Sequence, residues 1–200
     1  DMSPESGPEG TRARLLAAAA LEIRQIGPKR MTISGLAGRL GMSHANVYRY
    51  FSDKQAIIDA VLNLWLRGLE LRLQEIVDGP DPADDKLERF FATLTRAYAE
   101  TLAQDAPLFR LLAEPGEGRA EGERHRRRIE AFVERIVEEG NVTRLFAGGD
   151  SRRMALLTLD LAHRFCDPAA IFLADRVPGA TDARRDRVIR WAVRAMIGRK

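Results

Sequence analysis

The side chains best suited to recognising a ligand form a short polar group at residues 43–50. Asn46 can pair with adenine through two hydrogen bonds, and His44 can donate a hydrogen bond to guanine. Ser43, Arg49 and Tyr50 can reach phosphate oxygens or base edges. Because these groups would lie together on the outer face of one short helix, the pattern predicts contacts in the major groove of DNA.

The residues around this polar group predict how it is positioned. Two short apolar-periodic stretches meet at Gly41, which tolerates the positive φ that a tight turn between helices requires. Ala37 is small enough to let a second helix cross the first, and Val47 gives that second helix one buried anchor. This arrangement is typical of a helix-turn-helix, but an ordinary helical hairpin has the same pattern. The turn alone therefore leaves DNA binding open.

The residues that follow the turn favour DNA binding. The stretch from Thr11 to Leu66 resembles the DNA-binding region of the TetR family of bacterial transcriptional repressors. The matching positions are Thr32, Leu36-Ala37, Gly41-Met42-Ser43, and Tyr48, Phe51 and Lys54 of a Y-x-x-F-x-x-K run. Ala45 stands where the family often has glycine and Tyr50 where it often has histidine, and these differences bear on base preference. The candidate DNA-binding residues are Thr32, Ser43, His44, Ala45, Asn46, Tyr48, Tyr50 and Lys54.

Each candidate also has a simpler structural interpretation. Thr32 can be a plain helix N-cap, although a helix start favours an anion and the resemblance implies a phosphate contact there. Residues 43–46 can be a solvated first turn. Lys54 can be an ordinary exposed lysine, and only the resemblance implies that it contacts phosphate. Phe51 has no polar group and is expected in the core of the small domain.

Composition and charge agree with a small basic domain joined to a larger neutral one. The chain has 200 residues and a formal net charge of +3. Residues 11–55 hold eight Lys or Arg and two Asp or Glu, which gives this segment a charge of +6, while residues 56–200 are neutral. A basic small domain is expected to bind phosphates. The single Cys166 excludes an internal disulfide and is compatible with the cytoplasm.

Apolar periodicity predicts an all-α fold with two domains. Residues 1–10 are expected to be a flexible tail, residues 11–56 the helix-turn-helix domain, and residues 57–200 a helical domain for ligand binding and dimerisation. A helix of about 25 residues, ending near Asp78, is expected to join the two domains. Gly140 is expected to end another helix, which starts near Glu121. No membrane span is expected, because no apolar run is long enough.

The resemblance implies a ligand cavity and a dimer interface in the larger domain. The candidate cavity residues are Trp65, Leu69, Phe91, Tyr98, Phe109, Phe132 and His163, and each of them can instead be a core residue. The resemblance places the dimer surface on the last two helices, expected near residues 150–165 and 181–197. Their exposed apolar candidates are Leu157, Leu161, Trp191 and Ala195. One recognition helix covers half of a two-fold symmetric site, so a homodimer is expected.

No pattern in the chain predicts an enzyme, a cofactor or a metal site. His44, His125 and His163 have no catalytic spacing, and His163 with Cys166 gives too few ligands for zinc. The sequence therefore predicts a cytoplasmic regulator, a repressor released from a palindromic DNA operator by a small hydrophobic or amphipathic molecule. The alternatives are a helical ligand-binding or scaffold protein that does not read DNA, and a helical enzyme.

Overall fold

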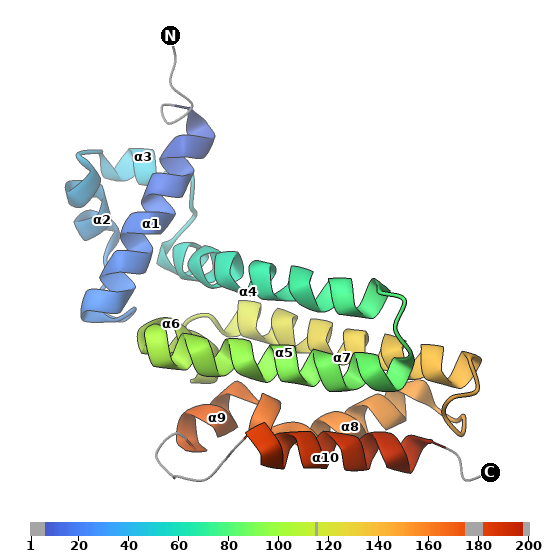
Figure 1. Cartoon of the computed structure of the whole chain (residues 1–200). Helices are drawn as coiled ribbons and strands as arrows, with labels where there is room; N and C mark the ends of the chain where they lie inside the picture. The colour runs from blue at the N-terminus through green and yellow to red at the C-terminus, as the bar shows by residue number, and fades with distance from the viewer. Residues whose placement is uncertain (1–6, 115, 175–181, 198–200) are drawn as a thin grey trace.

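The computed structural model describes residues 7–114, 116–174 and 182–197, and its regular elements over these residues are all helices (Figure 1). The helices are α1 Pro8–Ile26, α2 Ile33–Leu40, α3 His44–Tyr48, α4 Lys54–Asp78, α5 Ala83–Gln104, α6 Ala106–Ala113, α7 Arg119–Val142, α8 Ser151–Cys166, α9 Pro168–Ala174 and α10 Asp182–Met196. An isolated bridge also joins Phe146 to Ile197. The predicted all-α fold is confirmed.

Short polar side chains start α2, α3 and α4. The hydroxyl of Thr32 accepts a hydrogen bond from the Gly35 amide at 3.0 Å, and that of Ser43 accepts one from the Asn46 amide at 3.2 Å. At the start of α4 the carboxylate of Asp53 accepts the amide of the residue three positions later at 2.8 Å. These caps satisfy amides that a helix start would leave without a partner, so the sequence itself fixes where each helix begins.

Helix α4 belongs to both domains, which lie at opposite ends of the molecule in Figure 1. Its first half, including Ile58 and Leu62, is buried with α1, α2 and α3. Its second half, including Leu69 and Leu73, is buried in the larger core formed with α5, α7, α8 and α10. Trp65 lies between these halves and packs against both cores. A movement of α4 therefore displaces residues in the cores of both domains.

Several helix boundaries differ from the predictions. Helix α1 begins at Pro8, so residues 8–10 of the expected tail form its first turn, and residues 1–6 lie outside the described residues. The predicted last helix corresponds to α10, because α9 intervenes. The expected start of that helix at Thr181, and Pro178 and Gly179 before it, also lie outside the described residues.

The prediction that Gly140 ends a helix is wrong. Helix α7 continues to Val142, and Gly140 is a buried position within it. The ring of Phe146 lies so close to the Gly140 backbone that a Cβ there would collide with it. This glycine therefore allows a close approach rather than a helix end. Across the described residues, none of the helices has the length and apolar character needed to span a bilayer.

Candidate nucleic-acid interface and ligand cavity

The α2–α3 pair forms the predicted helix-turn-helix. Gly41 adopts φ 63° and ψ 33°, the left-handed conformation expected at the turn. A Cβ at Gly41 would meet no neighbour, so conformation alone favours glycine at this position. Ala37 is buried in the crossing, and Val47 is fully buried as the anchor of α3. The two helices are therefore held together by the residues that the sequence indicated.

The polar first turn of α3 faces outward. Ser43, His44 and Ala45 are exposed, and Asn46 is partly exposed. The side chain of Tyr48 at the end of the same helix is 53% exposed, which is high for an aromatic residue. Because Val47 fixes the inner face, these residues are available to enter a groove together. Thr32, at the start of α2, is also exposed, and its hydroxyl caps the helix.

Two other candidates have partners within the protein. Tyr50 is half-buried against the core of the small domain. The Lys54 ammonium donates a hydrogen bond to the Lys29 carbonyl at 3.0 Å. It also lies 3.8 Å from a carboxylate oxygen of Glu117, in the segment between α6 and α7. Lys54 is thus on the surface of the small domain and is in contact with the larger one.

The small domain has exposed basic residues outside the list of candidates, and sequence reasoning missed two of them, Lys29 and Arg30. Arg49 follows Tyr48 and was considered only as part of the polar face, while Lys29 and Arg30 precede the capping residue of α2. The Lys29 carbonyl contacts Lys54, so Lys29 lies beside the start of α4. The paired charges after Pro28 were a visible signal, but their position relative to the recognition helix is a tertiary feature.

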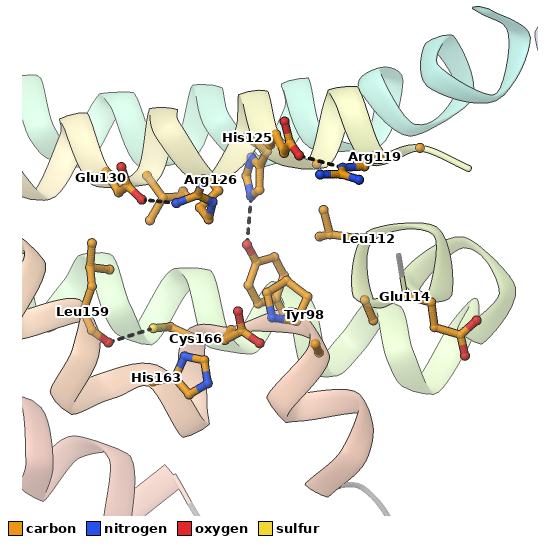
Figure 2. Close-up of a pocket in the computed structure, with 18 of the residues that line it drawn as sticks. Tyr98, Leu112, Glu114, Arg119, His125, Arg126, Glu130, Leu159, His163 and Cys166 are labelled. Atoms are coloured by element: carbon orange, nitrogen blue, oxygen red, sulfur yellow. Dashed lines mark hydrogen bonds and ion pairs between the residues drawn. The ribbon is translucent and has the colours of Figure 1, made fainter. Parts of the chain in front are cut away.

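A cavity of about 660 Å³ opens in the larger domain and is lined by residues from α5, α6, α7, α8 and α9 (Figure 2). Its apolar surface comes from residues such as Leu112, Ile129 and Leu159. Tyr98, from α5, points across it toward His125 on α7 (Figure 2). Its lining also includes seven charged side chains. An apolar cavity with polar groups around it is typical of a small-molecule site.

A buried chain of hydrogen bonds runs from this cavity to α4. The Tyr98 hydroxyl lies 2.8 Å from Nε2 of His125, and Nδ1 of His125 lies 2.7 Å from Oε1 of Glu70. All three residues are buried. A carboxylate can only accept, so Nδ1 of His125 donates to Glu70, and in the neutral ring Nε2 accepts from Tyr98. Arg124 also donates two hydrogen bonds to Glu70, at 3.0 and 3.1 Å.

The pKa values of Tyr98 and Glu70 follow from burial and from these hydrogen-bond partners. Burial, reinforced by nearby acidic groups, raises the pKa of Tyr98 well above its ordinary value, so the phenol stays protonated. Burial alone would raise the pKa of Glu70, but hydrogen bonds and charge from His125 and Arg124 outweigh it and lower that pKa. Glu70 is therefore an ionised acceptor at neutral pH.

Of the seven residues predicted to line a ligand cavity, Tyr98 and His163 do so. Leu69, Phe91, Phe109 and Phe132 are buried in the core instead. Trp65 is half-buried and faces a separate groove between α1 and α4. Aromatic side chains of the core pack against one another, and the ring of Phe90 lies edge-on to those of Phe91 and Phe132. Sequence reasoning missed Glu70 and His125, whose 55-residue separation gives no local signal.

The outer faces of α8 and α10 carry exposed apolar side chains. Leu157 and Leu161 on α8 are about half exposed, and Trp191 on α10 is 65% exposed. Ala195 is exposed as well. The two helices pack against each other, and they form the face of the molecule opposite α4 (Figure 1). Apolar residues grouped in this way are typical of a protein interface.

Two family models match the chain. The model described as "Bacterial regulatory proteins, tetR family" matches residues 15–61. The model described as "Tetracyclin repressor-like, C-terminal domain" matches residues 83–188, more than half of the chain. The first match covers the helix-turn-helix and the second most of the larger domain. No curated protein is similar enough in sequence to count as a match.

Solved structures with the same fold include several regulators. SmeT in complex with triclosan has a TM-score of 0.70 and 16% identity, and the match covers 94% of this chain and 92% of that one. FadR from Bacillus subtilis in complex with stearoyl-CoA has a TM-score of 0.62 and 19% identity, covering 90% and 97%. A TetR/AcrR family regulator from Thermobifida fusca has a TM-score of 0.62 and 19% identity, covering 93% and 96%.

Proposed function

The chain belongs to the TetR family of bacterial regulatory proteins and is a DNA-binding transcriptional regulator; we propose that it is a cytoplasmic, homodimeric repressor of a palindromic operator. The observation that carries the proposal is the outer face of α3. Its first turn presents Ser43, His44 and Ala45 to solvent while Val47 is fully buried beneath them. A recognition helix needs this division between a fixed inner face and a free outer face.

In this proposal the candidate residues have two roles. His44, Ala45 and Asn46 read bases, with Asn46 on adenine and Ala45 close to a thymine methyl. The remaining residues contact phosphates and so fix the position of the helix without reading sequence. They are Thr32, Ser43, Tyr48, Tyr50 and Lys54. The local charge of +6 supports this second role.

A gel shift with the promoter regions of the protein's own gene and its neighbours tests DNA reading. Single His44→Ala and Asn46→Ala variants are each expected to lose on the order of 1–3 kcal/mol on the cognate site and to relax one base position per half-site. Glu138→Ala is the control, since Glu138 is exposed on α7. Binding that favours no promoter sequence would instead support a helical ligand-binding protein without DNA reading.

We further propose that α8 and α10 form the dimer interface. The support is the exposed apolar group of Leu157, Leu161, Trp191 and Ala195 on two helices that pack together. Burying such side chains against a second copy removes apolar surface from water. The double variant Leu161→Glu with Trp191→Glu is expected to be monomeric in analytical ultracentrifugation and to lose operator binding. A folded double variant that stays dimeric would place the interface elsewhere.

The cavity beside Tyr98 is the proposed effector site, and Glu70 is its link to α4. A rise of about 1.5 Å per residue places Glu70 roughly 24 Å along the helix axis from Lys54. An effector that displaces Tyr98 or His125 changes the partners of Glu70 and can tilt α4, which changes the separation of the two recognition helices. A coupling of about 1–3 kcal/mol would weaken operator binding some 5- to 150-fold.

The coupling is tested by measuring effector affinity with and without operator. Binding free energies are reciprocal, so operator DNA must weaken effector binding by the same factor by which effector weakens operator binding. Equal effector affinities in the two states would mean that the cavity is not an inducer site. Tyr98→Phe removes the hydroxyl and is expected to reduce the response to effector while leaving operator affinity unchanged without effector.

A further inference from the structure

The charges that line the proposed effector cavity are unbalanced. Its lining includes two guanidinium groups and five carboxylates. The carboxylates are those of Glu114, Glu123, Glu130, Asp160 and Asp167. Both arginines are neutralised by a glutamate one turn away on α7. Arg119 donates to Glu123 at 2.8 Å, and Arg126 donates to Glu130 at 2.7 Å (Figure 2). The cavity therefore keeps a surplus of negative charge.

Of the other three carboxylates, Glu114 is paired with Arg110 at 3.6 Å. Asp160 and Asp167 therefore hold the surplus. Asp160, on α8, makes no hydrogen bond or ion pair with any described residue. Asp167, between α8 and α9, accepts one hydrogen bond, from the Ala170 amide at 2.8 Å, and has no ion-pair partner within the described residues. Both aspartates line the cavity, so a bound molecule would lie beside two carboxylates without a cationic partner.

The fields of these aspartates reach the interior of the cavity. Burial, together with the charges of Asp167 and Asp160, raises the pKa of the Cys166 thiol to about 12. Asp167 also helps burial to raise the pKa of Tyr98. A negatively charged group placed there would be repelled by the same carboxylates, and a positively charged group would be stabilised by them.

The buried hydrogen-bond chain adds an acceptor. Because His125 donates its Nδ1 hydrogen to Glu70, Nε2 of the neutral ring accepts a hydrogen bond from the Tyr98 hydroxyl. The Tyr98 oxygen can therefore still accept a hydrogen bond, and it has no further proton to donate. The remainder of the lining includes the apolar side chains of Leu112 and Ile129. The cavity thus suits an apolar molecule that carries a hydrogen-bond donor.

We infer that the effector is an amphipathic cation, an apolar body with an ammonium group that lies between Asp160, Asp167 and the Tyr98 oxygen. This rests on the proposed function and specifies the ligand class of its effector cavity. The volume of about 660 Å³ is in the range of sites for drug-sized molecules. An acyl-CoA, such as FadR from Bacillus subtilis holds in its structure, would bring phosphates against these carboxylates.

Three probes with the same decyl chain isolate the effect of charge: decylammonium, decanol and decanoate. Isothermal titration calorimetry at neutral pH and low salt is expected to give the tightest binding for decylammonium, on the order of tenfold tighter than for decanoate. Raising the salt concentration should narrow that difference, because Asp160 is exposed and Asp167 is partly exposed.

Asp160→Asn and Asp167→Asn remove one charge each, and an asparagine at 167 can still accept the Ala170 amide. Each variant is expected to weaken decylammonium binding about two- to fivefold, the range for a solvent-open ion pair. Decanol binding should stay within about twofold. Glu138→Gln is the matched control, because it removes an exposed charge on α7 outside the cavity.

The inference is overturned if decanoate or decanol binds as tightly as decylammonium, if both aspartate variants behave like Glu138→Gln, or if none of the probes binds. The promoter gel shift keeps a failure of the proposed function separate. If promoter recognition is absent but the preference for the cation is found, the proposed regulatory function is wrong and the cation site stands. If promoter recognition is found but the preference for the cation is absent, the cation site is wrong and the regulatory function stands.

Discussion

Replacing Glu70 with glutamine tests whether the buried carboxylate joins α4 to α7. Glu70 accepts two hydrogen bonds from Arg124 and one from His125. Glutamine has nearly the same shape, but one of its two terminal atoms is a donor that must face other donors. At least one hydrogen bond to a charged group is lost, and such bonds contribute about 1.5–3 kcal/mol each.

The expected loss for Glu70→Gln is about 2–3 kcal/mol at pH 7. It stays within this range because Arg124 keeps its ion pair with Glu121. For a chain of this size each kcal/mol lowers the Tm by about 2–4 °C, so the midpoint should fall by roughly 4–12 °C. Glu75→Gln is the control on the same helix. Glu75 is exposed, so that variant should stay within about 0.5 kcal/mol of the parent.

The pH dependence gives a second measurement. The folded-state pKa of Glu70 lies below its ordinary value of 4.5, so the charged carboxylate stabilises the fold above pH 4.5. That contribution is lost as the pH falls below 4.5 and through the lower, folded-state pKa. Urea unfolding from pH 7 downward should therefore show that the difference in the free energy of unfolding between the parent and Glu70→Gln becomes smaller in acid. A difference that is absent at pH 7, or that does not become smaller in acid, would refute the argument.

Two further predictions concern the DNA surface and the core. Lys54→Ala should weaken binding to all duplexes alike and reduce the slope of log affinity against log salt concentration by about one. Glu117→Gln, which frees Lys54 from its ion pair, should weaken binding to none of them. An unchanged slope for Lys54→Ala would remove that lysine from the interface. Gly140→Ala should cost about 1–3 kcal/mol in urea unfolding, because the new Cβ meets the Phe146 ring. Gly68→Ala, in open space on α4, should instead stabilise by up to about 1 kcal/mol, and equal effects of the two would contradict this account.

The small domain could be predicted from the sequence because its determinants are local. The turn at Gly41, the cap at Ser43 and the anchor at Val47 lie within seven residues, and each acts through its own backbone or its own helix face. The apolar stripe of α4 is also local, because residues three or four apart share one face. A single sequence therefore indicated which face of α3 is free.

The cavity could not be predicted in the same way. Tyr98, His125 and Glu70 come from three helices, and the two hydrogen bonds that join them span 27 and 55 residues. Nothing near each residue in sequence distinguishes it from a surface group. The aromatic residues of α5, such as Phe91, were likewise compatible with the core and with the cavity. In the structure Phe91 is buried in the core.

Helix α4 contacts the larger domain at its start and again near its middle, and these contacts limit how an effector signal can travel. Near its middle Glu70 is held by His125 and Arg124, and at its start Lys54 lies beside Glu117. The segment with Glu117 joins α6 to α7, and its neighbours Glu114 and Gly118 line the cavity. A Cβ at Gly118 would press on Leu62 of α4, so this segment also touches the rod directly.

A ligand in the cavity can therefore act on α4 at two points along its length. A push at only one point would let a rigid helix pivot about the other. Displacing both the His125 contact and the segment between α6 and α7 shifts the whole of α4, together with the small domain, whose core includes the first half of that helix. Disabling one link by Glu70→Gln should then reduce the coupling free energy between effector and operator, and adding Glu117→Gln should reduce it further. If Glu70→Gln alone abolishes the response, the signal passes through the buried carboxylate and the Glu117 contact has no part in it.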